Sequence, residues 1–150
     1  MSFERNIIVE VFNESSQPLP SYSHEGDAGA DVYSCEQVKV YPGETVMVKT
    51  GLYVAIPFGY EIQVRPRSGL SAKTTLRVAN APGTIDHQYR GELKVLIDNI
   101  GNDPVEININ DRIAQLIIKP VWNIVWRQVN SKDALGKTMR GEGGFGSTGK

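Results

Sequence analysis

The sequence predicts an all-β protein built as a sandwich or a barrel. About ten short segments are β-branched or alternate between apolar and polar residues, and turn residues separate them closely. No alternation of strands with helices and no internal repeat is present, which argues against a parallel α/β fold. At 150 residues, of which 40% are hydrophobic, the chain is long enough for one domain with a substantial core.

The first half of the chain contains five predicted strands. They are expected at residues 6–12, 32–33, 38–41, 45–49 and 51–56. Pro42-Gly43 and Pro57-Phe-Gly59 are turn signals, because proline fixes φ and glycine accepts positive φ. Residues 14–25 are polar and contain two prolines, so this stretch predicts a surface loop.

The second half is organised around a turn at Pro82-Gly83. Strands are expected at residues 60–64, 75–79, 92–97, 105–109 and 112–121, and residues 68–73 are the one helix candidate. The strands on either side of the turn predict a hairpin-like arm with Asp86 and Tyr89 near its bend. This stretch alone leaves two interpretations open. Either Asp86 caps the turn and Tyr89 packs in the hairpin, or Asp86 is a general base and Tyr89 is a flat surface against which a ligand ring lies.

The last segment differs from the rest in composition. Residues 131–150 are rich in glycine and poor in large apolar side chains, so they cannot bury a core of their own. The sequence therefore predicts a folded domain over residues 1–130 and a mobile C-terminal arm over 131–150.

Composition also limits the partners and the compartment. The net charge of −1 gives no basic field for nucleic acid, and two histidines with one cysteine are too few for a Cys/His zinc site. A single cysteine excludes an intrachain disulfide and fits a reducing compartment. No signal-peptide core and no apolar run of ~18 residues is present, so we expect a cytoplasmic protein without a membrane span.

The stretch Arg65-Pro-Arg-Ser-Gly-Leu70 links a predicted strand to the predicted helix. Pro66 favours an extended Arg65, and Ser68 is the expected N-cap. Free backbone N–H groups with Arg67 beside them form an anion site. Capping explains the serine and the glycine but not the arginine, so phosphate binding is the favoured interpretation.

Three further stretches contain polar residues with two possible roles each. Asp31 follows a glycine turn and either closes a loop hydrogen bond or binds a ligand. Gln115 lies in an apolar strand, where its amide needs partners from the backbone or from a ligand. Arg140 and Phe145 lie among glycines in a segment that is either a linker or a lid over a ligand.

Taken together in this order on an all-β chain, these stretches resemble the trimeric dUTPase family (deoxyuridine 5′-triphosphate nucleotidohydrolase). The resemblance covers residues 27–149 and rests on Ala28-Gly-Ala-Asp31, Pro66-Arg-Ser-Gly-Leu70 and residues 80–91, 111–116 and 140–149. It implies a jelly-roll fold and a homotrimer with active sites shared between subunits. It also implies hydrolysis of dUTP to dUMP and pyrophosphate, which limits uracil incorporation into DNA and supplies dUMP for thymidylate synthesis.

The resemblance also implies a role for each matching residue. Asp86 would activate a water against the α-phosphorus, and Asp31 would reach Mg²⁺ through water. Phosphates would be bound by Arg67, Ser68, Gly69 and Gln115, and the nucleoside by Asn80, Gly83, Thr84, Ile85, Tyr89 and Lys94. From the tail, Phe145 would stack over the uracil while Arg140, Gly146, Ser147 and Thr148 close on the phosphates of a neighbouring subunit's site.

Two positions depart from the family pattern, and two other functions share its fold. Arg65 stands where a small or apolar residue is usual, and His87-Gln88 replaces a small residue followed by an acidic one. A dCTP deaminase would have a different central motif and tail. A non-catalytic nucleotide sensor or a protein-binding jelly roll would lack Asp86 or the tail. The presence of both features favours the hydrolase.

Overall fold

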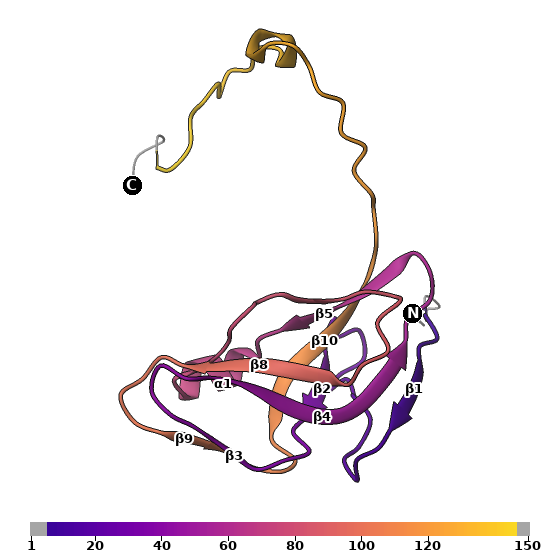
Figure 1. Ribbon diagram of the computed structural model, residues 1–150, viewed down its shortest axis with the longest axis vertical. Helices are drawn as coiled ribbons and strands as arrows, with labels where there is room; N and C mark the ends of the chain where they lie inside the picture. Colours follow the sequence, from indigo (N-terminus) through magenta and orange to yellow (C-terminus); the bar gives the residue numbers. More distant parts are fainter. Residues whose placement is uncertain (1–5, 147–150) are drawn as a thin grey trace.

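The computed structural model describes residues 6–146, which form two packed four-stranded sheets and a smaller ribbon (Figure 1). The first sheet has the order β1 (Glu10–Asn13), β4 (Thr45–Ala55), β8 (Leu93–Asn99), β6 (Leu76–Val78). The second has the order β2 (Ala30–Tyr33), β10 (Arg112–Pro120), β5 (Tyr60–Arg65), β7 (Gly83–Ile85). The ribbon pairs β3 (Val38–Val40) with β9 (Val105–Ile107).

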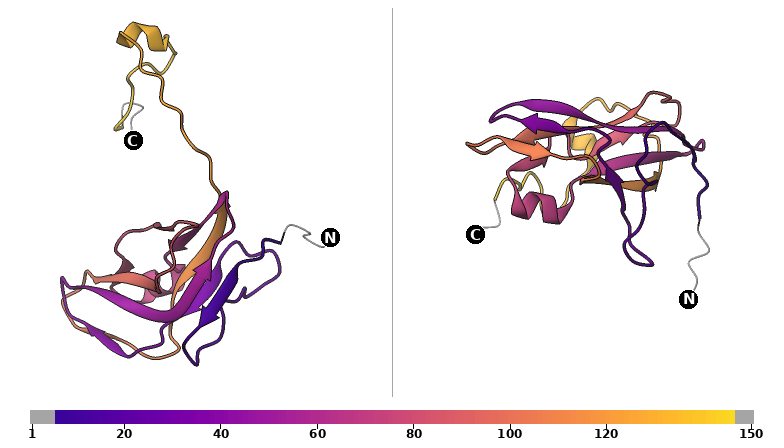
Figure 2. Two further views of the ribbon diagram at one scale, coloured as in Figure 1. Left: turned by 45° about the vertical axis from the view of Figure 1, so that its right-hand side comes forward. Right: turned by 90° about the horizontal axis from the view of Figure 1, so that it is seen from below.

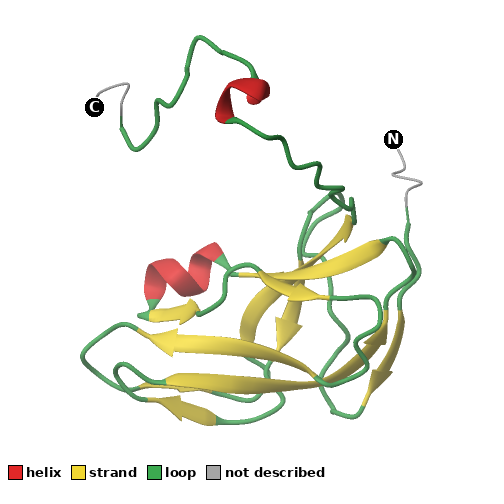
Figure 3. Cartoon of the chain, turned by 45° about the horizontal axis from the view of Figure 1, so that its top comes forward, coloured by secondary structure: helices red, strands yellow, loops and turns green. Residues whose placement is uncertain are grey.

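Strands dominate the described chain, and helices are short (Figure 3). The only α-helix in residues 6–146 is α1 (Ser68–Lys73), and a 3₁₀ turn, η1 (Lys132–Leu135), lies in the tail. All described strand pairs are antiparallel. The all-β prediction and the predicted helix at residues 68–73 are therefore confirmed.

The core lies between the two large sheets and is made almost entirely of Val, Ile and Leu. On β8, Leu93, Val95 and Ile97 are buried while the residues between them point outward, which is the period-two pattern of a strand with one buried face. Burial of each such side chain contributes about 1.5–3 kcal/mol. This alternation decides which side chains of each sheet are left facing outward.

Three of the predicted strands differ clearly in the structure. The strand expected over residues 6–12 begins at Glu10. The strands expected at 45–49 and 51–56 form one strand, β4, whose register shifts between Lys49 and Leu52. Gly51 has φ +70° at this irregularity, so it bends the strand without ending it.

The central arm is more complex than a hairpin. Its stem is confirmed, because β6 pairs with β8. Beyond the stem, however, Gly83–Ile85 crosses to the second sheet and pairs with β5 as strand β7. Gly83 and Ile85 are buried there, so core packing draws this short segment away from its sequence neighbours. The turn that carries Asp86 therefore follows a strand of one sheet and precedes a strand of the other.

The chain leaves the folded body after β10. Val121 donates its N–H to the carbonyl of Gly59 at 2.9 Å, and residues 122–146 then run away from the sheets (Figures 1 and 2). Trp122, Val125 and Trp126 are exposed along this segment. Within residues 6–146, no helix is long and apolar enough to cross a membrane.

The single cysteine, Cys35, lies just after β2 and is partly exposed. Burial raises the pKa of its thiol, and the nearby carboxylates of Glu92 and Glu36 act in the same direction. The thiol is therefore held in its protonated, less reactive form.

Asn99 joins several parts of the sandwich through its buried side chain, which is 1% exposed. Its Nδ2 donates to the carbonyls of Val40 and Asp103, and its Oδ1 accepts from Thr75 Oγ1 and from the N–H of Gly101, all at 2.7–2.9 Å. We expect Asn99→Ala to lower the free energy of unfolding by about 2–4 kcal/mol, because buried polar groups lose their partners.

Chemical denaturation at matched protein concentration measures this loss. Asn102→Ala, in the exposed loop beside it, is the control and is expected to change stability by less than about 0.5 kcal/mol. Equal effects of the two substitutions would contradict the role assigned to Asn99.

Candidate active site

A polar cavity of about 330 Å³ lies on the outward face of the second sheet. Val64 on β5 and Leu116 on β10 point into the core, so the neighbouring residues of these strands point outward and line the cavity. The cavity brings together the residues predicted to bind phosphate or metal, namely Asp31, Arg67, Ser68, Gly69 and Gln115.

Asp31 holds two arginines at one wall of this cavity. Arg67 Nε donates to Asp31 Oδ1 at 2.7 Å, and Arg112 Nη1 donates to Asp31 Oδ2 at 3.3 Å. Asp31 is only 8% exposed, so the carboxylate and the guanidinium of Arg67 fix each other's position. The remaining N–H groups of Arg67 are left for other partners, with one weak contact at 3.5 Å to the carbonyl of Arg112.

The helix has its predicted bounds, but its N-cap is one residue earlier than expected. Ser71 donates its N–H to the carbonyl of Arg67, so Arg67 is the N-cap of α1 and Ser68 is its first helical residue. The predicted N-cap at Ser68 is therefore wrong. The reason is that the Asp31 contact holds Arg67 in an extended conformation directly before the helix. The Ser68 hydroxyl is consequently exposed beside the cavity instead of capping the helix.

Gln115 is held between Gly29 and the start of the helix. Its Nε2 donates to the carbonyl of Pro66 at 3.0 Å, which leaves the second amide hydrogen for another acceptor. A Cβ built on Gly29 would lie 2.4 Å from Gln115 Oε1, so only glycine leaves room for this amide. Gln115 thus has one backbone partner, the carbonyl of Pro66, and keeps one amide hydrogen that a ligand can accept.

A second cavity, of about 340 Å³, contains the residues of the central arm. Met47, Lys94 and Leu96 line it from β4 and β8, and these side chains point away from the core. The predicted members are Thr84, Ile85, Asp86, Tyr89 and Lys94. Asp86 is exposed here, and Lys94 lies 3.8 Å from the carboxylate of Glu92.

Tyr89 is fixed by the end of the arm. Its hydroxyl donates to the carbonyl of Glu92 at 3.0 Å, and a Cβ built on Gly91 would lie within 2.9 Å of three atoms of the phenol. The ring thus packs against the Gly91 backbone. Asn80 lines neither cavity but has its Nδ2 3.3 Å from the Cβ position of Gly83, so Gly83 gives this amide room.

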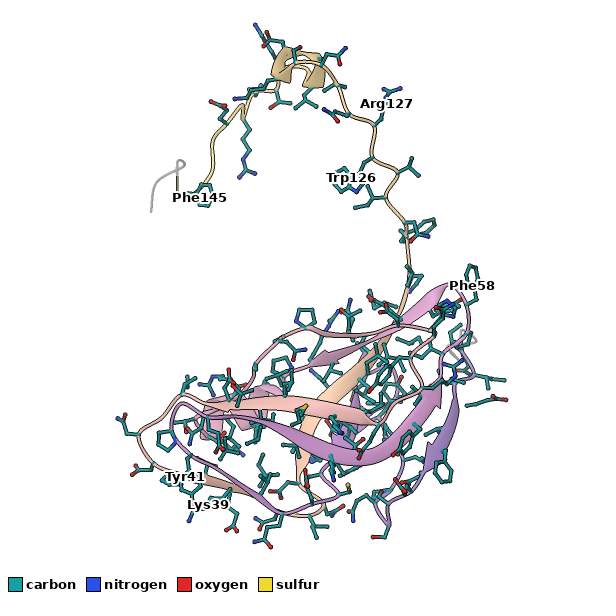
Figure 4. The ribbon with its side chains drawn as sticks, in the orientation of Figure 1. Lys39, Tyr41, Phe58, Trp126, Arg127 and Phe145 are labelled. Atoms are coloured by element: carbon teal, nitrogen blue, oxygen red, sulfur yellow. The ribbon has the colours of Figure 1, made fainter. Side chains whose placement is uncertain are left out.

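The two cavities share no lining residue: the first is lined from β2, β5, β10 and the start of α1, and the second from β4, β7, β8 and the turn after β7. Phe145 lies on the extended tail, away from the sheets (Figure 4). Neither Phe145 nor Arg140 lines either cavity. Gly146 ends the described part of the tail, and the predicted residues Ser147 and Thr148 lie outside the described residues.

Several residues that face these cavities were not predicted to have roles. In the first cavity they include Ser23, Asp27 and Arg65, and in the second Met47 and Leu96. Arg65 reaches the first cavity through the register of β5 and β10, which pairs it with Gln115 and is seen only in the structure. The other residues are brought to the site by loops and by the far sheet, for which the sequence carries no local signal.

The comparisons with known proteins agree with this arrangement. The sequence profile of the dUTPase family matches residues 15–149. The chain belongs to the dUTPase family. It is 54% identical to the deoxyuridine 5′-triphosphate nucleotidohydrolase of Zymomonas mobilis over 88% of each chain. It is 45% identical to the enzyme of the same name from Clostridioides difficile, over 96% of this chain and 98% of that protein.

Solved dUTPase structures have the same fold. The dUTPase of Staphylococcus bacteriophage 80alpha with dUpNHpp aligns with a TM-score of 0.84 and 32% identity, over 97% of this chain and all of that one. A mutant dUTPase of phage phi11 of S. aureus, described with a structural Mg(II) ion, aligns with a TM-score of 0.76 and 30% identity, over 85% of this chain and 99% of that one. The jelly-roll prediction is confirmed by these neighbours.

A double-mutant cycle tests the contact between Gly29 and Gln115. Gly29→Ala places a methyl group where the Gln115 amide lies, so we expect the unfolding free energy to fall by about 1–3 kcal/mol. In a Gln115→Ala background the same substitution costs less, with a coupling of about 1 kcal/mol. Equilibrium denaturation of the four proteins provides the values.

Gly69→Ala is the control for this cycle, because a Cβ at Gly69 meets nothing within 4 Å. It lies in α1 and is expected to be neutral or to stabilise by up to about 1 kcal/mol. Additive effects of Gly29→Ala and Gln115→Ala would show that the two residues do not constrain each other.

Proposed function

We propose that this chain hydrolyses dUTP to dUMP and pyrophosphate by attack of water on the α-phosphorus. The observation that carries the proposal is the gathering of Arg67, Ser68, Gly69 and Gln115 in one polar cavity, in a dUTPase-family chain that also carries Asp86 beside Tyr89. The first group has the donors that a triphosphate needs, and the second has a carboxylate and an aromatic ring for a nucleotide.

The phosphates bind to the donors that the fold leaves free. Arg67 presents the part of its guanidinium that Asp31 does not use, and Gln115 presents its second amide hydrogen. The backbone N–H groups of Ser68 and Gly69 open α1 and have no partner within the helix. Because these donors are already held in place, little reorganisation is needed when phosphate binds.

The nucleoside binds to the central arm. Backbone groups near Thr84 and Ile85, the side chain of Asn80 and the main chain at Lys94 select uracil, because cytosine would leave buried donors and acceptors unpaired. Gly83 leaves room for Asn80. Tyr89 lies flat against the deoxyribose, where a 2′-hydroxyl would meet the ring.

Asp86 is the general base. Its exposed carboxylate takes a proton from water as the water oxygen bonds to the α-phosphorus, and the bond to the bridging oxygen of pyrophosphate breaks. The proton is first held on an Asp86 oxygen and then returns to solvent. Apart from this transfer the protein positions the reactants and neutralises charge.

The residues fit a Mg²⁺ ion that is carried mainly by the substrate. No cluster of three or more metal-binding side chains occurs in the described residues, and both oxygens of Asp31 already accept from arginines. A carboxylate oxygen retains a further lone pair for water, and Mg²⁺ prefers phosphates and water to an all-protein cage. When bound, Mg²⁺ neutralises phosphate charge and makes phosphorus more electrophilic.

The complete site is formed between copies of the chain in a homotrimer. The phosphate cavity and the Asp86 cavity share no lining residue, and in this proposal a second copy supplies the missing half. Residues 131–150 form an arm that closes over a neighbouring copy's site. Exposed Phe145 stacks on the base, and Arg140, Gly146, Ser147 and Thr148 reach the phosphates.

Replacement of the base tests the mechanism. Asp86→Asn keeps the shape of the side chain but loses the proton acceptor, so turnover should fall about 10²–10⁴-fold. Pyrophosphate release is measured with dUTP, dCTP, dTTP and UTP in the presence of Mg²⁺, and only dUTP is expected to be turned over efficiently. In ¹⁸O-water the label should appear in dUMP.

Asp103→Asn, in an exposed loop, removes the same charge and should leave turnover unchanged. Label in pyrophosphate would place the attack at the β-phosphorus. Near-normal turnover by Asp86→Asn would remove Asp86 from the role of base.

A further inference from the structure

Arg65 lies in the phosphate cavity although the dUTPase resemblance gives it no role. It ends β5, and strand β10 pairs Gln115 both with Arg65 and with Asp31 on β2. Paired residues of antiparallel strands point to the same face with Cβ atoms about 4.5–5.5 Å apart. Asp31, Gln115 and Arg65 thus form one row across the outward face of the second sheet.

The guanidinium of Arg65 is held from one side only. Its Nε and Nη2 donate to Gln63 Oε1 at 3.0 and 2.7 Å. Gln63 in turn donates from Nε2 to Glu61 Oε1 at 2.6 Å. These contacts use two of the five N–H donors of an arginine and restrict its orientation, so little further ordering is needed when an anion binds.

Two arginines, Arg65 and Arg67, line the cavity, and the charge of Arg65 is the less neutralised of the two. Arg67 is paired directly with Asp31, whereas none of the ion pairs found among residues 6–146 involves Arg65. The lining side chains of Asp27, Asp31, Arg65 and Arg67 sum to zero, and without Arg65 they would sum to −1. Arg112 lies outside the lining but pairs with Asp31, and it raises each of these sums by one. Arg65 therefore makes the difference between a neutral site and one with a net charge of +1, which favours capture of a triphosphate.

Under the proposed function, we propose that Arg65 binds the two phosphates that leave as pyrophosphate and thereby sets the preference of this enzyme for a triphosphate over a monophosphate. A charge-assisted contact of this kind acts on dUTP and not on dUMP. Gln63 is its positioning residue, because it holds the guanidinium in the cavity.

Binding measurements separate this role from a general effect of charge. The non-hydrolysable analogue dUpNHpp and dUMP are titrated into the full-length protein by calorimetry in the presence of Mg²⁺. Arg65→Gln should weaken binding of the analogue about 10- to 100-fold, as expected for loss of a hydrogen-bonded charge, and change binding of dUMP less than about twofold. Arg65→Lys should recover part of the affinity.

Lys119→Gln is the matched control. Lys119 is an exposed residue of β10 opposite Glu61, so its replacement removes the same charge from the same sheet without touching the cavity lining. It should leave both affinities unchanged. Unchanged analogue binding by a folded Arg65→Gln protein, or an equal loss for dUMP, would overturn the proposal.

Inorganic tripolyphosphate distinguishes failure of this proposal from failure of the proposed function. If wild-type protein binds tripolyphosphate and Arg65→Gln binds it at least tenfold more weakly, Arg65 is a polyphosphate contact even if dUTP is not hydrolysed. If dUTP is hydrolysed but Arg65→Gln binds tripolyphosphate as the wild type does, the enzyme assignment holds and the role of Arg65 is wrong.

Discussion

Gln115 faces Asp31 on one side and Arg65 on the other, and this register of β10 is the constraint on which the phosphate cavity depends. A slip of one residue would turn Gln115 into the core and bring Leu116 to the surface. The core prevents this slip, because Ile113, Ala114 and Leu116 are buried between the sheets. Apolar packing on one face of the strand thereby fixes the polar arrangement on the other.

The same two-layer construction underlies the proposal that a single copy is incomplete. Alternation on β8 sends Lys94 and Leu96 outward from the first sheet, whereas alternation on β5 and β10 sends Arg65 and Gln115 outward from the second. A core ~10 Å thick separates the two sets. In our account, assembly therefore does more than stabilise the fold, because it brings a phosphate cavity and a nucleoside cavity together.

Sequence patterns predicted those features that depend on neighbouring residues. The alternation in β8 and β9 and the helix at residues 68–73 are of this kind. The turn expected at Pro82-Gly83 is wrong in its position, because the chain turns at residues 79–80 and Gly83, without a positive φ, begins strand β7. Strand β7 was missed, because three residues are too few to show a period. The cap at Ser68 was wrong because Asp31, far away in the sequence, determines the conformation of Arg67.

The site residues also fall into two groups, those that the sequence indicates and those that only the structure reveals. Residues such as Asp86 and Arg67 stand out by type and local context, and the family resemblance gives them roles. Arg65 and Asp27 are brought to the cavity only by strand register and by a loop, which a single sequence does not reveal. The tail is a further example: Trp122 and Trp126 continue an apolar pattern, yet the structure leaves them exposed outside the sheet.

Complementation between two inactive chains tests the shared site most directly. One chain lacks residues 139–150 and keeps Asp86; the other carries Asp86→Asn and keeps its tail. Each assembly alone should be nearly inactive. After joint unfolding and refolding in equal amounts, about three in four cyclic trimers are mixed, and each mixed trimer has one site with both a good Asp86 and a good tail.

The shared-site account predicts recovery of about a quarter of the wild-type activity, since one site in three is complete in those mixed trimers. Native mass measurement confirms that mixed trimers are present. If the tail instead served the Asp86 of its own chain, no mixed trimer would contain a complete site. Recovery near zero, with mixed trimers present, would contradict the account.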